Sequence, residues 1–284
     1  MFVSYAQNQE DVVLYRLTRF VERGTYVDVG AAHPVIHNVT YALYLAGWRG
    51  INVEPMATEA EMLRSVRPED ITFQVAVGAA AGSVVIHTGP SENRGASTAR
   101  TDLAAKYRSQ GQIFSTETVE MVRLETLLDS LGTADIHILK IDVEGLEREV
   151  LEGVNFSRTR PWVLVVESTR PNTTEDSSHE WEALITDSGY VVTLFDGLNK
   201  FYVREDLESV QKALSVPANV FDEWISWELD EARRVLGETS SQSQAFTQSL
   251  LERAEISENY AAHLESLLNK ANGWLPARVR TNEI

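Results

Sequence analysis

Four acidic residues stand at the ends of short apolar runs in this 284-residue chain: Asp28, Glu54, Asp142 and Glu167. Carboxylates placed in this way can bind the hydroxyl groups of a ribose, take a proton from a hydroxyl group, or hold a divalent cation. If the runs are parallel strands, their carboxyl ends meet at one edge of a sheet, where open α/β folds bind their ligands. The pattern therefore predicts a ligand site at that edge.

The first run ends in a glycine turn, Val29-Gly30-Ala31-Ala32. A dinucleotide-binding loop carries glycines at three fixed places, and here only the first is present. The backbone of this turn therefore cannot come as close to a ligand as pyrophosphate binding requires. A nucleoside without phosphates fits better. S-adenosylmethionine is such a ligand, with its amino acid part on the turn, its ribose on Glu54 and its sulfonium near the strand-tip acids. We predict contacts to this methyl donor from Asp28, Gly30, Ala31, Glu54 and Asp142.

Two further pairs of residues are expected to contact the methyl donor. Asn38 and Thr40 open a predicted helix, residues 38–45. There they cap the helix, hold the carboxylate of the methyl donor with the N-terminal amides, or do both. Ala76 and Val77 end the predicted third strand, residues 71–78, and their small apolar side chains suit one face of an adenine ring. That they are ordinary core residues is an equally good interpretation.

Methyl transfer to an oxygen requires a group that removes the proton of the acceptor. Asp142, Glu144 and His33 are the candidate catalytic residues. Asp142 and Glu167, at neighbouring strand tips, also form a candidate Mg²⁺ site, in which the metal would bind the acceptor hydroxyl and lower its pKa. The competing interpretations are structural: Asp142 caps the next helix, Glu144 is a solvated first-turn acid, and His33 is an exposed loop histidine.

The composition narrows the class of protein. Hydrophobic residues make up 43% and charged residues 24%, as in ordinary globular proteins, and the net charge is −17. Such a charge argues against a nucleic-acid partner and against docking on an anionic membrane. Cysteine is absent, and no apolar run approaches the ~18 residues of a transmembrane helix. With no signal-peptide pattern at its start, the chain is expected to be cytoplasmic.

The order of apolar runs and helical patterns predicts the architecture. Strand and helix patterns alternate, which favours a doubly wound, mostly parallel sheet. Residues 82–88 alternate like an additional edge strand. Residues 190–195 and 200–203 flank a hairpin turn, so the sheet is expected to end antiparallel. We predict an α/β domain over residues 1–206, a helical extension over 207–237, and a linker with an amphipathic helix over 238–284.

The last of these segments carries an apolar seam. Leu250, Ala254, Ala261, Leu264, Leu268 and Ala271 follow alternating steps of four and three residues, with Ser257 filling the one polar position of the series. This spacing predicts a short coiled coil or helical hairpin, which needs a partner to bury it. A second copy of the chain, another protein or the α/β domain itself are the candidate partners.

The acidic residues belong to longer motifs. Residues 26–34 contain the glycine turn, residues 47–55 end in Glu54-Pro55, and residues 139–153 contain Asp142-Val143-Glu144-Gly145. With residues 38–41 and the opening residues 4–11, these motifs make the chain similar to the FkbM-type methyltransferases over residues 4–203. The resemblance implies a class I methyltransferase fold with a seven-stranded sheet and S-adenosylmethionine as methyl donor.

The resemblance also implies O-methylation, commonly of a sugar hydroxyl on a glycan or a natural product. We therefore predict an S-adenosylmethionine-dependent O-methyltransferase that acts on a sugar hydroxyl of a bacterial polysaccharide or glycan. Two alternatives stay open. One is O-methylation of a small secondary metabolite, and the other is a non-catalytic module that binds a partner in a glycan-synthesis complex.

Overall fold

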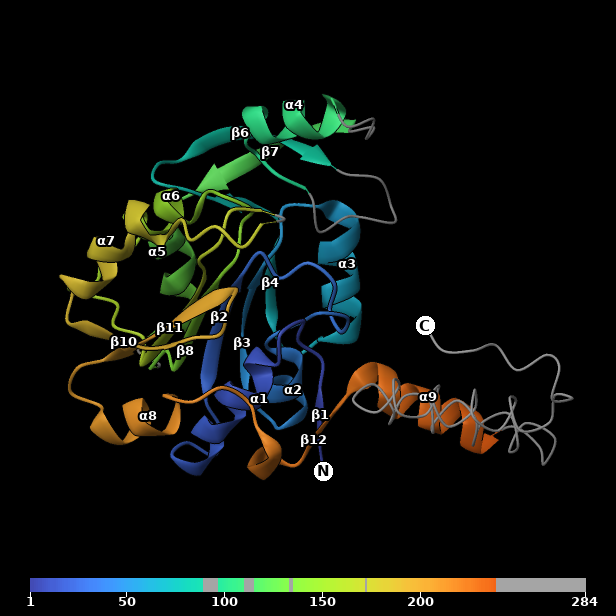
Figure 1. The fold of residues 1–284 in the computed structure, drawn as a ribbon. Helices are drawn as coiled ribbons and strands as arrows, with labels where there is room; N and C mark the ends of the chain where they lie inside the picture. The colour runs from blue at the N-terminus through green and yellow to red at the C-terminus, as the bar shows by residue number, and fades with distance from the viewer. Residues whose placement is uncertain (89–96, 110–114, 133–134, 172, 239–284) are drawn as a thin grey trace, which may run out of the picture. The chain divides into compact units, whose positions relative to one another are not determined.

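The computed structural model describes residues 1–88, 97–109, 115–132, 135–171 and 173–238. Its centre is a seven-stranded sheet with the strand order β10-β11-β9-β8-β2-β3-β4 (Figure 1). Neighbouring strands run parallel except at β11, which is antiparallel to both β9 and β10. The predicted mostly parallel sheet with an antiparallel end hairpin is therefore confirmed. The strands are β2 (Thr25–Val29), β3 (Arg49–Val53), β4 (Ile71–Phe73), β8 (Ile138–Ile141), β9 (Val163–Glu167), β10 (Tyr190–Phe195) and β11 (Asn199–Arg204).

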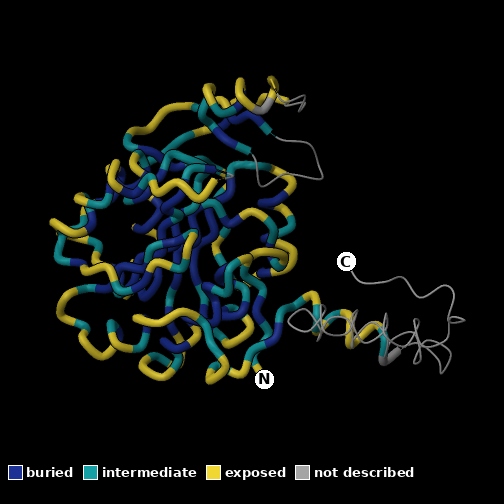
Figure 2. Tube along the Cα trace, in the orientation of Figure 1, coloured by how far each residue is buried: buried dark blue, intermediate teal, exposed yellow. Residues whose placement is uncertain are grey.

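Helices cover both faces of this sheet. Tyr26 packs with apolar residues of α1 and α2, and its neighbour Val27 packs on the other face with residues of α5, α6 and α7. Central strands covered on both faces need continuous apolar runs, which is the pattern the sequence has there. Figure 2 shows the buried strands between more exposed helices. The helices are α1 (Glu10–Tyr15), α2 (Tyr41–Leu45), α3 (Ala57–Val66), α5 (Leu124–Leu128), α6 (Glu147–Glu152), α7 (Glu182–Thr186) and α8 (Glu208–Ala213), with 3-10 helices at Arg16–Arg19, Asp129–Leu131, Ser178–Glu180 and Val220–Asp222.

Between β4 and α5 the chain forms a second, three-stranded sheet in the order β5-β7-β6. β5 (Ala76–Val77) runs parallel to β7 (Ser115–Val122), and β6 (Gly82–Thr88) pairs antiparallel with β7 along its whole length. α4 (Thr101–Ser109) lies beside these strands (Figure 1). The third strand of the main sheet ends at Phe73, so the prediction that it reaches residue 78 was wrong. Residues 82–88 do form an edge strand, as predicted, but this strand borders the three-stranded sheet and not the seven-stranded one, because β6 pairs with β7.

The two ends of the first structural unit meet. β1 (Phe2–Ser4) pairs in parallel with β12 (Trp224–Ser226). The chain divides into two compact units, residues 1–226 and 227–284, so the first unit extends beyond residue 206, where we placed the end of the α/β domain. The second unit contains α9 (Trp227–Glu238). The apolar seam at residues 250–271 lies outside the described residues, and the coiled coil stays a prediction.

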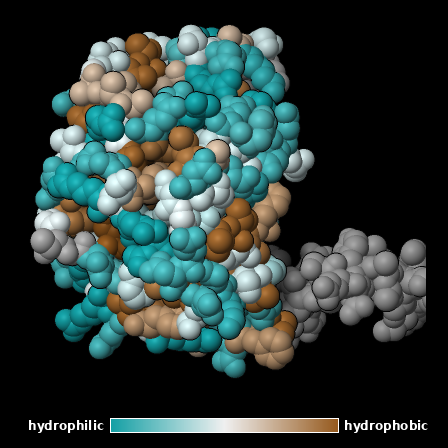
Figure 3. Space-filling model, turned by 90° about the vertical axis from the view of Figure 1, so that its left-hand side faces the viewer, coloured by the Kyte–Doolittle hydropathy of each residue, from teal (hydrophilic) through white to brown (hydrophobic). Residues whose placement is uncertain are grey.

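The surface beside the edge strand β10 is mixed in character. Val191, Val192 and Phe195 are partly exposed there. Figure 3, which views the molecule from the left of Figure 1, shows small hydrophobic patches between hydrophilic ones. Scattered apolar residues of this kind are normal on a folded protein. Among the helices of the described residues, none combines the length and the apolar character that crossing a membrane requires.

Candidate active site

The glycine turn after β2 packs against the end of β8. Asp142 N donates a hydrogen bond to Val29 O at 3.1 Å, and Gly30 N donates to Val53 O at 3.0 Å. Gly30 has a φ of +77°, and a Cβ atom at this residue would lie 1.8 Å from Asp142 O. We expected the glycine to admit a ligand. In the structure, the close approach of the Asp142 backbone already requires a residue without a Cβ atom at this position.

A buried lysine connects the turn with the acids. Lys140 Nζ lies 3.3 Å from Asp28 Oδ1 and 3.5 Å from Asp142 Oδ2, and it donates to Gly30 O at 2.8 Å. Burial alone would lower the pKa of Lys140, but the charges of Asp28 and Asp142 outweigh it and hold this pKa above its usual value. The Asp28 side chain is fully buried, whereas that of Asp142 is 38% exposed. Asp28 therefore positions Lys140, and Asp142 faces the open side.

A second network fixes the loop between β2 and α2. Thr40 Oγ1 donates to Asp28 Oδ2 at 2.7 Å, and Arg67 Nη1 donates to Thr40 Oγ1 at 2.9 Å. The guanidinium of Arg67 also bonds to Pro34 O, Asn38 Oδ1 and Asn52 Oδ1, and this side chain is fully buried. A buried cation with this many partners holds the surrounding loop in one conformation.

Asn38 is occupied by the same loop. Its Oδ1 accepts hydrogen bonds from Thr40 N and Tyr41 N, both at 2.9 Å, and its Nδ2 donates to Ala31 O and His33 O. These are the amides that we expected to hold the carboxylate of the methyl donor. α2 itself has only five residues and begins at Tyr41. Asn38 thus satisfies two amides at the start of α2, whereas the N-cap residue Thr40 makes no capping hydrogen bond with its own side chain, and a contact of either residue with the methyl donor stays a prediction.

Glu54 clasps the glycine turn from the end of β3. Its Oε2 accepts a hydrogen bond from Ala32 N at 2.9 Å, and its Oε1 accepts one from Met56 N at 2.8 Å. Ala32 adopts a φ of +49°, which brings its N–H to this carboxylate. Burial raises the pKa of Glu54 to about 7, although both amide hydrogen bonds act against the rise. Each oxygen keeps a further lone pair, so Glu54 can still accept from ribose hydroxyls.

Three acids converge where β8 and β9 end. The register pairs Ile141 with Val166, so the next residues, Asp142 and Glu167, stand at neighbouring strand tips. Glu167 Oε2 is buried and has no hydrogen-bond partner among the described residues. Burial, followed by the charges of Asp142 and Glu144, raises the pKa of Glu167 to about 10. Glu167 therefore carries a proton at neutral pH.

The loop after Asp142 is strained and internally braced. Glu144 and Gly145 have φ values of +55° and +98°. Glu147 Oε1 accepts hydrogen bonds from Val143 N at 3.2 Å and Gly145 N at 3.1 Å. Burial first, and then the charge of Asp142, raises the pKa of Glu144 well above its usual value. Glu147 thus supports the loop that presents Asp142 and Glu144.

His33 is part of the loop rather than aimed at the acids. Its Nδ1 accepts hydrogen bonds from Val35 N at 3.1 Å and Ile36 N at 2.9 Å. Burial lowers the pKa of His33, in agreement with a ring nitrogen that accepts from two amides. In this tautomer the remaining ring nitrogen carries the proton, so His33 offers no free basic atom.

Ala76 and Val77 lie away from the tip of the third strand. They form β5 and pair with Met121 and Val122 of β7 in the second sheet. Val77 is also a member of the apolar core cluster on the α5 face. Of the two interpretations that the sequence allowed, the structure places Val77 in the core, and the adenine contact stays a prediction.

The described residues do not fit the predicted Mg²⁺ site. Within them, no three His, Asp or Glu side chains come together in a way that would hold a metal ion. Asp142 already has the Lys140 ammonium as counter-ion, and burial raises the pKa of Glu167, so a metal would have to displace both this cation and a proton before the two carboxylates could bind it.

The same residues do fit a cationic nucleoside without phosphates. The edge presents carboxylates that can accept from hydroxyls or face a positive charge, at Glu54 and Asp142. The cation beside the turn, Lys140, is engaged by Asp28, Asp142 and Gly30 O, so it is not set up to bind a phosphate. Glu54 suits the ribose of such a ligand, and Asp142 lies where its positive charge would be stabilised.

Three charged residues at this edge were missed by the sequence reasoning. Lys140 had a signal, because a lysine inside an apolar strand is buried only when paired. Glu147 lay in the motif around Asp142 but looked like a solvated helix residue. Arg67 ends α3 just before Pro68, and nothing in the sequence shows that its side chain turns inward.

The strand order, the single antiparallel strand and the acids at the carboxyl edge define a methyltransferase-like α/β fold. The methyltransferase FkbM domain model matches residues 28–192, which is more than half of the chain. The chain therefore belongs to the FkbM methyltransferase domain family, and this family uses S-adenosylmethionine as methyl donor.

Comparison with solved structures finds precorrin-6y C5,15-methyltransferase from Geobacter metallireducens GS-15. It is 12% identical in sequence, the match covers 69% of this chain and 87% of that chain, and the TM-score is 0.39. A search of curated proteins finds no match.

Proposed function

We propose that this protein transfers the methyl group of S-adenosylmethionine to a hydroxyl group of a carbohydrate, in the assembly of a bacterial polysaccharide or glycan. The observation that carries the proposal is the position of Asp142. Its carboxylate is 38% exposed, and its backbone touches Gly30 in the turn that Glu54 clasps. A site for the methyl donor and a base for the acceptor thus adjoin each other.

On the methyl-donor side, Glu54 binds the ribose hydroxyls, and residues 30–32 hold the amino acid part. S-adenosylmethionine, when bound, supplies a methyl carbon that is open to attack because its sulfur is positively charged. The turn is held in place by a chain of hydrogen bonds that runs from Arg67 through Thr40 to Asp28. This rigidity limits the reorganisation that binding requires.

On the acceptor side, Asp142 is the base. A sugar hydroxyl is a poor nucleophile, and a positioned carboxylate that takes its proton raises its reactivity. Asp142 passes this proton to solvent, to which it is open. Burial raises the pKa of Glu167, so this side chain offers a protonated carboxyl group at the same edge, which can donate a hydrogen bond to an acceptor bound there. Lys140 stays charged beside Asp142 and keeps it oriented.

Calorimetry with S-adenosylmethionine tests the methyl-donor half. The intact protein is expected to bind it in the micromolar range. Glu54→Ala should weaken binding at least about tenfold, since a hydrogen bond to a charged group contributes about 1.5–3 kcal/mol. Glu208→Ala, which removes an exposed acid on α8, is the matched control and should bind like the parent. No binding by the intact protein would refute the proposal.

Labelled methyl donor tests the acceptor half. Incubation with a panel of methyl glycosides should yield O-methylated sugar. A second panel of small phenols and aliphatic alcohols represents the metabolite alternative. Transfer to the second panel alone would show that the acceptor is a small metabolite and not a carbohydrate. If neither panel is methylated while the methyl donor still binds, then neither kind of hydroxyl group is the acceptor.

A further inference from the structure

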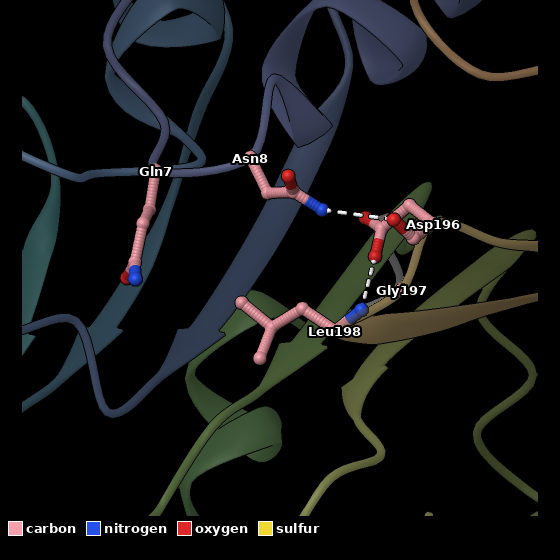
Figure 4. A pocket seen from close by; sticks show the side chains of 5 residues that line it. All are labelled: Gln7, Asn8, Asp196, Gly197 and Leu198. Carbon is pink, nitrogen blue, oxygen red and sulfur yellow. Dashed lines mark hydrogen bonds between the residues drawn. The ribbon is translucent and has the colours of Figure 1, made fainter. Parts of the chain in front are cut away.

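A small cavity lies between the N-terminal loop and the turn that joins β10 to β11. It has a volume of about 280 Å³ and is lined by Gln7, Asn8, Asp196, Gly197 and Leu198 (Figure 4). Ligand pockets in proteins commonly begin at ~300 Å³, so this cavity suits one small ring rather than an extended chain. None of the residues discussed above for the methyl donor lines it.

The loop that forms one wall is anchored at both ends. Near its start, Asn38 N donates to Tyr5 O at 3.0 Å, and Tyr5 N donates to Asp11 Oδ2 at 2.6 Å. Near its end, Asn8 Nδ2 donates to Asp196 O at 3.2 Å, as Figure 4 shows. Gln7 stands between these anchors. Its side chain points into the cavity and is not hydrogen-bonded to the other four lining residues (Figure 4).

The anchors place the cavity at the edge of the sheet that holds the acids. Asn38 belongs to the loop after β2, and Asp196 follows β10, which runs in the same direction as β2. In the sheet, β8 and β9 lie between these strands, and they end in Asp142 and Glu167. The opposite wall adjoins Glu167 as well, because Asn199 pairs with Glu167 and Ser168 N donates to Leu198 O at 2.9 Å.

The lining groups define the chemistry of an occupant. Asp196 Oδ1 accepts from Leu198 N at 2.8 Å and Asn199 N at 2.7 Å, so this carboxylate oxygen serves the turn. The other oxygen, Asp196 Oδ2, accepts, among the described residues, only from Asn199 Nδ2, at 3.5 Å. The cavity also offers the primary amides of Gln7 and Asn8 and the apolar side chain of Leu198. An amide both donates and accepts, as a hydroxyl does, and an aliphatic side chain suits the C–H face of a ring. The five lining residues include no basic group that a phosphate or carboxylate would need.

We propose that this cavity is the acceptor subsite, that it binds one neutral sugar ring, and that Gln7 recognises the hydroxyl groups of that ring. This inference rests on the proposed function and makes it more specific. It assigns the acceptor to the gap between the N-terminal loop and the β10–β11 turn, and it excludes acceptors whose recognised ring is anionic.

Saturation-transfer NMR with the full-length protein tests the assignment. The probes are neutral methyl glycosides and the matching uronic acids, each measured with S-adenosylhomocysteine present. Neutral glycosides should show saturation transfer, and uronic acids should show little. Gln7→Trp fills the cavity and should reduce the signal at least about fivefold, the loss expected from one or two hydrogen bonds. Lys212→Trp places the same indole on the exposed face of α8 and should leave the signal unchanged.

Binding of S-adenosylhomocysteine, measured on the same samples, separates the two proposals. If it binds and the glycosides give no signal, or if their signal survives Gln7→Trp, the acceptor subsite is refuted while the methyl-donor site stands. A stronger signal from uronic acids would also refute a neutral ring. If S-adenosylhomocysteine itself fails to bind to the intact protein, the proposed function fails first.

Discussion

The turn after β2 and the acids after β8 and β9 lie side by side and differ in how their polar groups are satisfied. Around the turn, Asp28, Asn38 and Glu54 have hydrogen bonds or ion pairs within the protein. Asp28 Oδ1 and Glu167 Oε2 are both buried without a hydrogen bond among the described residues, but Asp28 Oδ1 faces the Lys140 ammonium at 3.3 Å, whereas Glu167 Oε2 at the strand tips has no such cation. The polar groups around the turn therefore have partners within the protein, and the strand-tip oxygen without a partner in the described part of the chain supports the proposal that an acceptor binds there.

The largest effect is expected at the acceptor side. Asp142→Asn keeps the shape of the side chain but removes the base, so kcat should fall about 10²- to 10⁴-fold. The dissociation constant for S-adenosylmethionine should rise by a smaller factor, since the variant also loses the charge that is expected to face the sulfonium. The control in both assays is Asp206→Asn, which changes an exposed acid just after β11. A kcat within threefold of the parent would assign the proton to another group and remove Asp142 as the base.

The next effect tests whether the methyl-donor side is preassembled. Arg67→Met retains length but leaves Pro34 O and Asn38 Oδ1 without their buried partner, and the loss of unfolding free energy should be about 3–5 kcal/mol. Thermal unfolding measures it, with Arg64→Met as the control, because Arg64 lies on the same helix with its side chain 41% exposed. Equal melting temperatures for both variants would mean that the loop does not depend on Arg67.

Stability should also depend on pH, in a direction set by the buried acids. Burial raises the pKa of Glu54 and Glu147 to about 7 each. At these two groups the folded protein therefore binds more protons than the unfolded chain between pH ~4.3, the ordinary value for glutamate, and pH 7. This outweighs the opposite contribution expected from His33, His87 and His137, whose pKa values are lowered by burial. The free energy of unfolding must fall as pH rises through this window, and the melting temperature should be lower at pH 8 than at pH 5.5.

Calorimetric melting curves at the two pH values measure this difference. Glu147→Gln keeps an oxygen for the two loop amides but cannot ionise, so it should reduce the difference by several degrees or less. Glu208→Gln removes an exposed acid and should leave the difference unchanged. A melting temperature that rises between pH 5.5 and pH 8 would contradict the direction of these pKa shifts.

The smallest effect separates the two acids at the strand tips. Because Glu167 is protonated at neutral pH, Glu167→Gln should keep kcat within about threefold, since an amide still donates a hydrogen bond. Glu167→Ala removes the donor and should be more impaired than Glu167→Gln. If Glu167→Gln instead abolishes turnover while methyl-donor binding is retained, then Glu167 is the base.

Sequence reasoning succeeded where backbone pattern alone decides the outcome. Apolar runs and the turn at Gly30 predicted the parallel strands, and strand direction then placed Asp142 and Glu167 at one edge. It failed where the outcome depends on which side chain meets which amide. His33 was a candidate base and Asn38 a cap or a contact to the methyl donor, and the sequence did not show that each satisfies amides of a loop that includes the positive φ of Ala32 and His37. Such a loop conformation has no periodic signal in the sequence.

The contact between Gly30 and the Asp142 carbonyl has a thermodynamic consequence. With 1.8 Å between that oxygen and the place of a Cβ atom, the two backbones cannot be displaced toward each other, and one shifts only if the other gives way. If the turn binds the methyl donor and Asp142 is the base, as proposed, this contact couples the two mechanically. Such coupling is reciprocal. If a displacement of Asp142 strengthens methyl-donor binding, then methyl-donor binding favours that displacement by the same free energy.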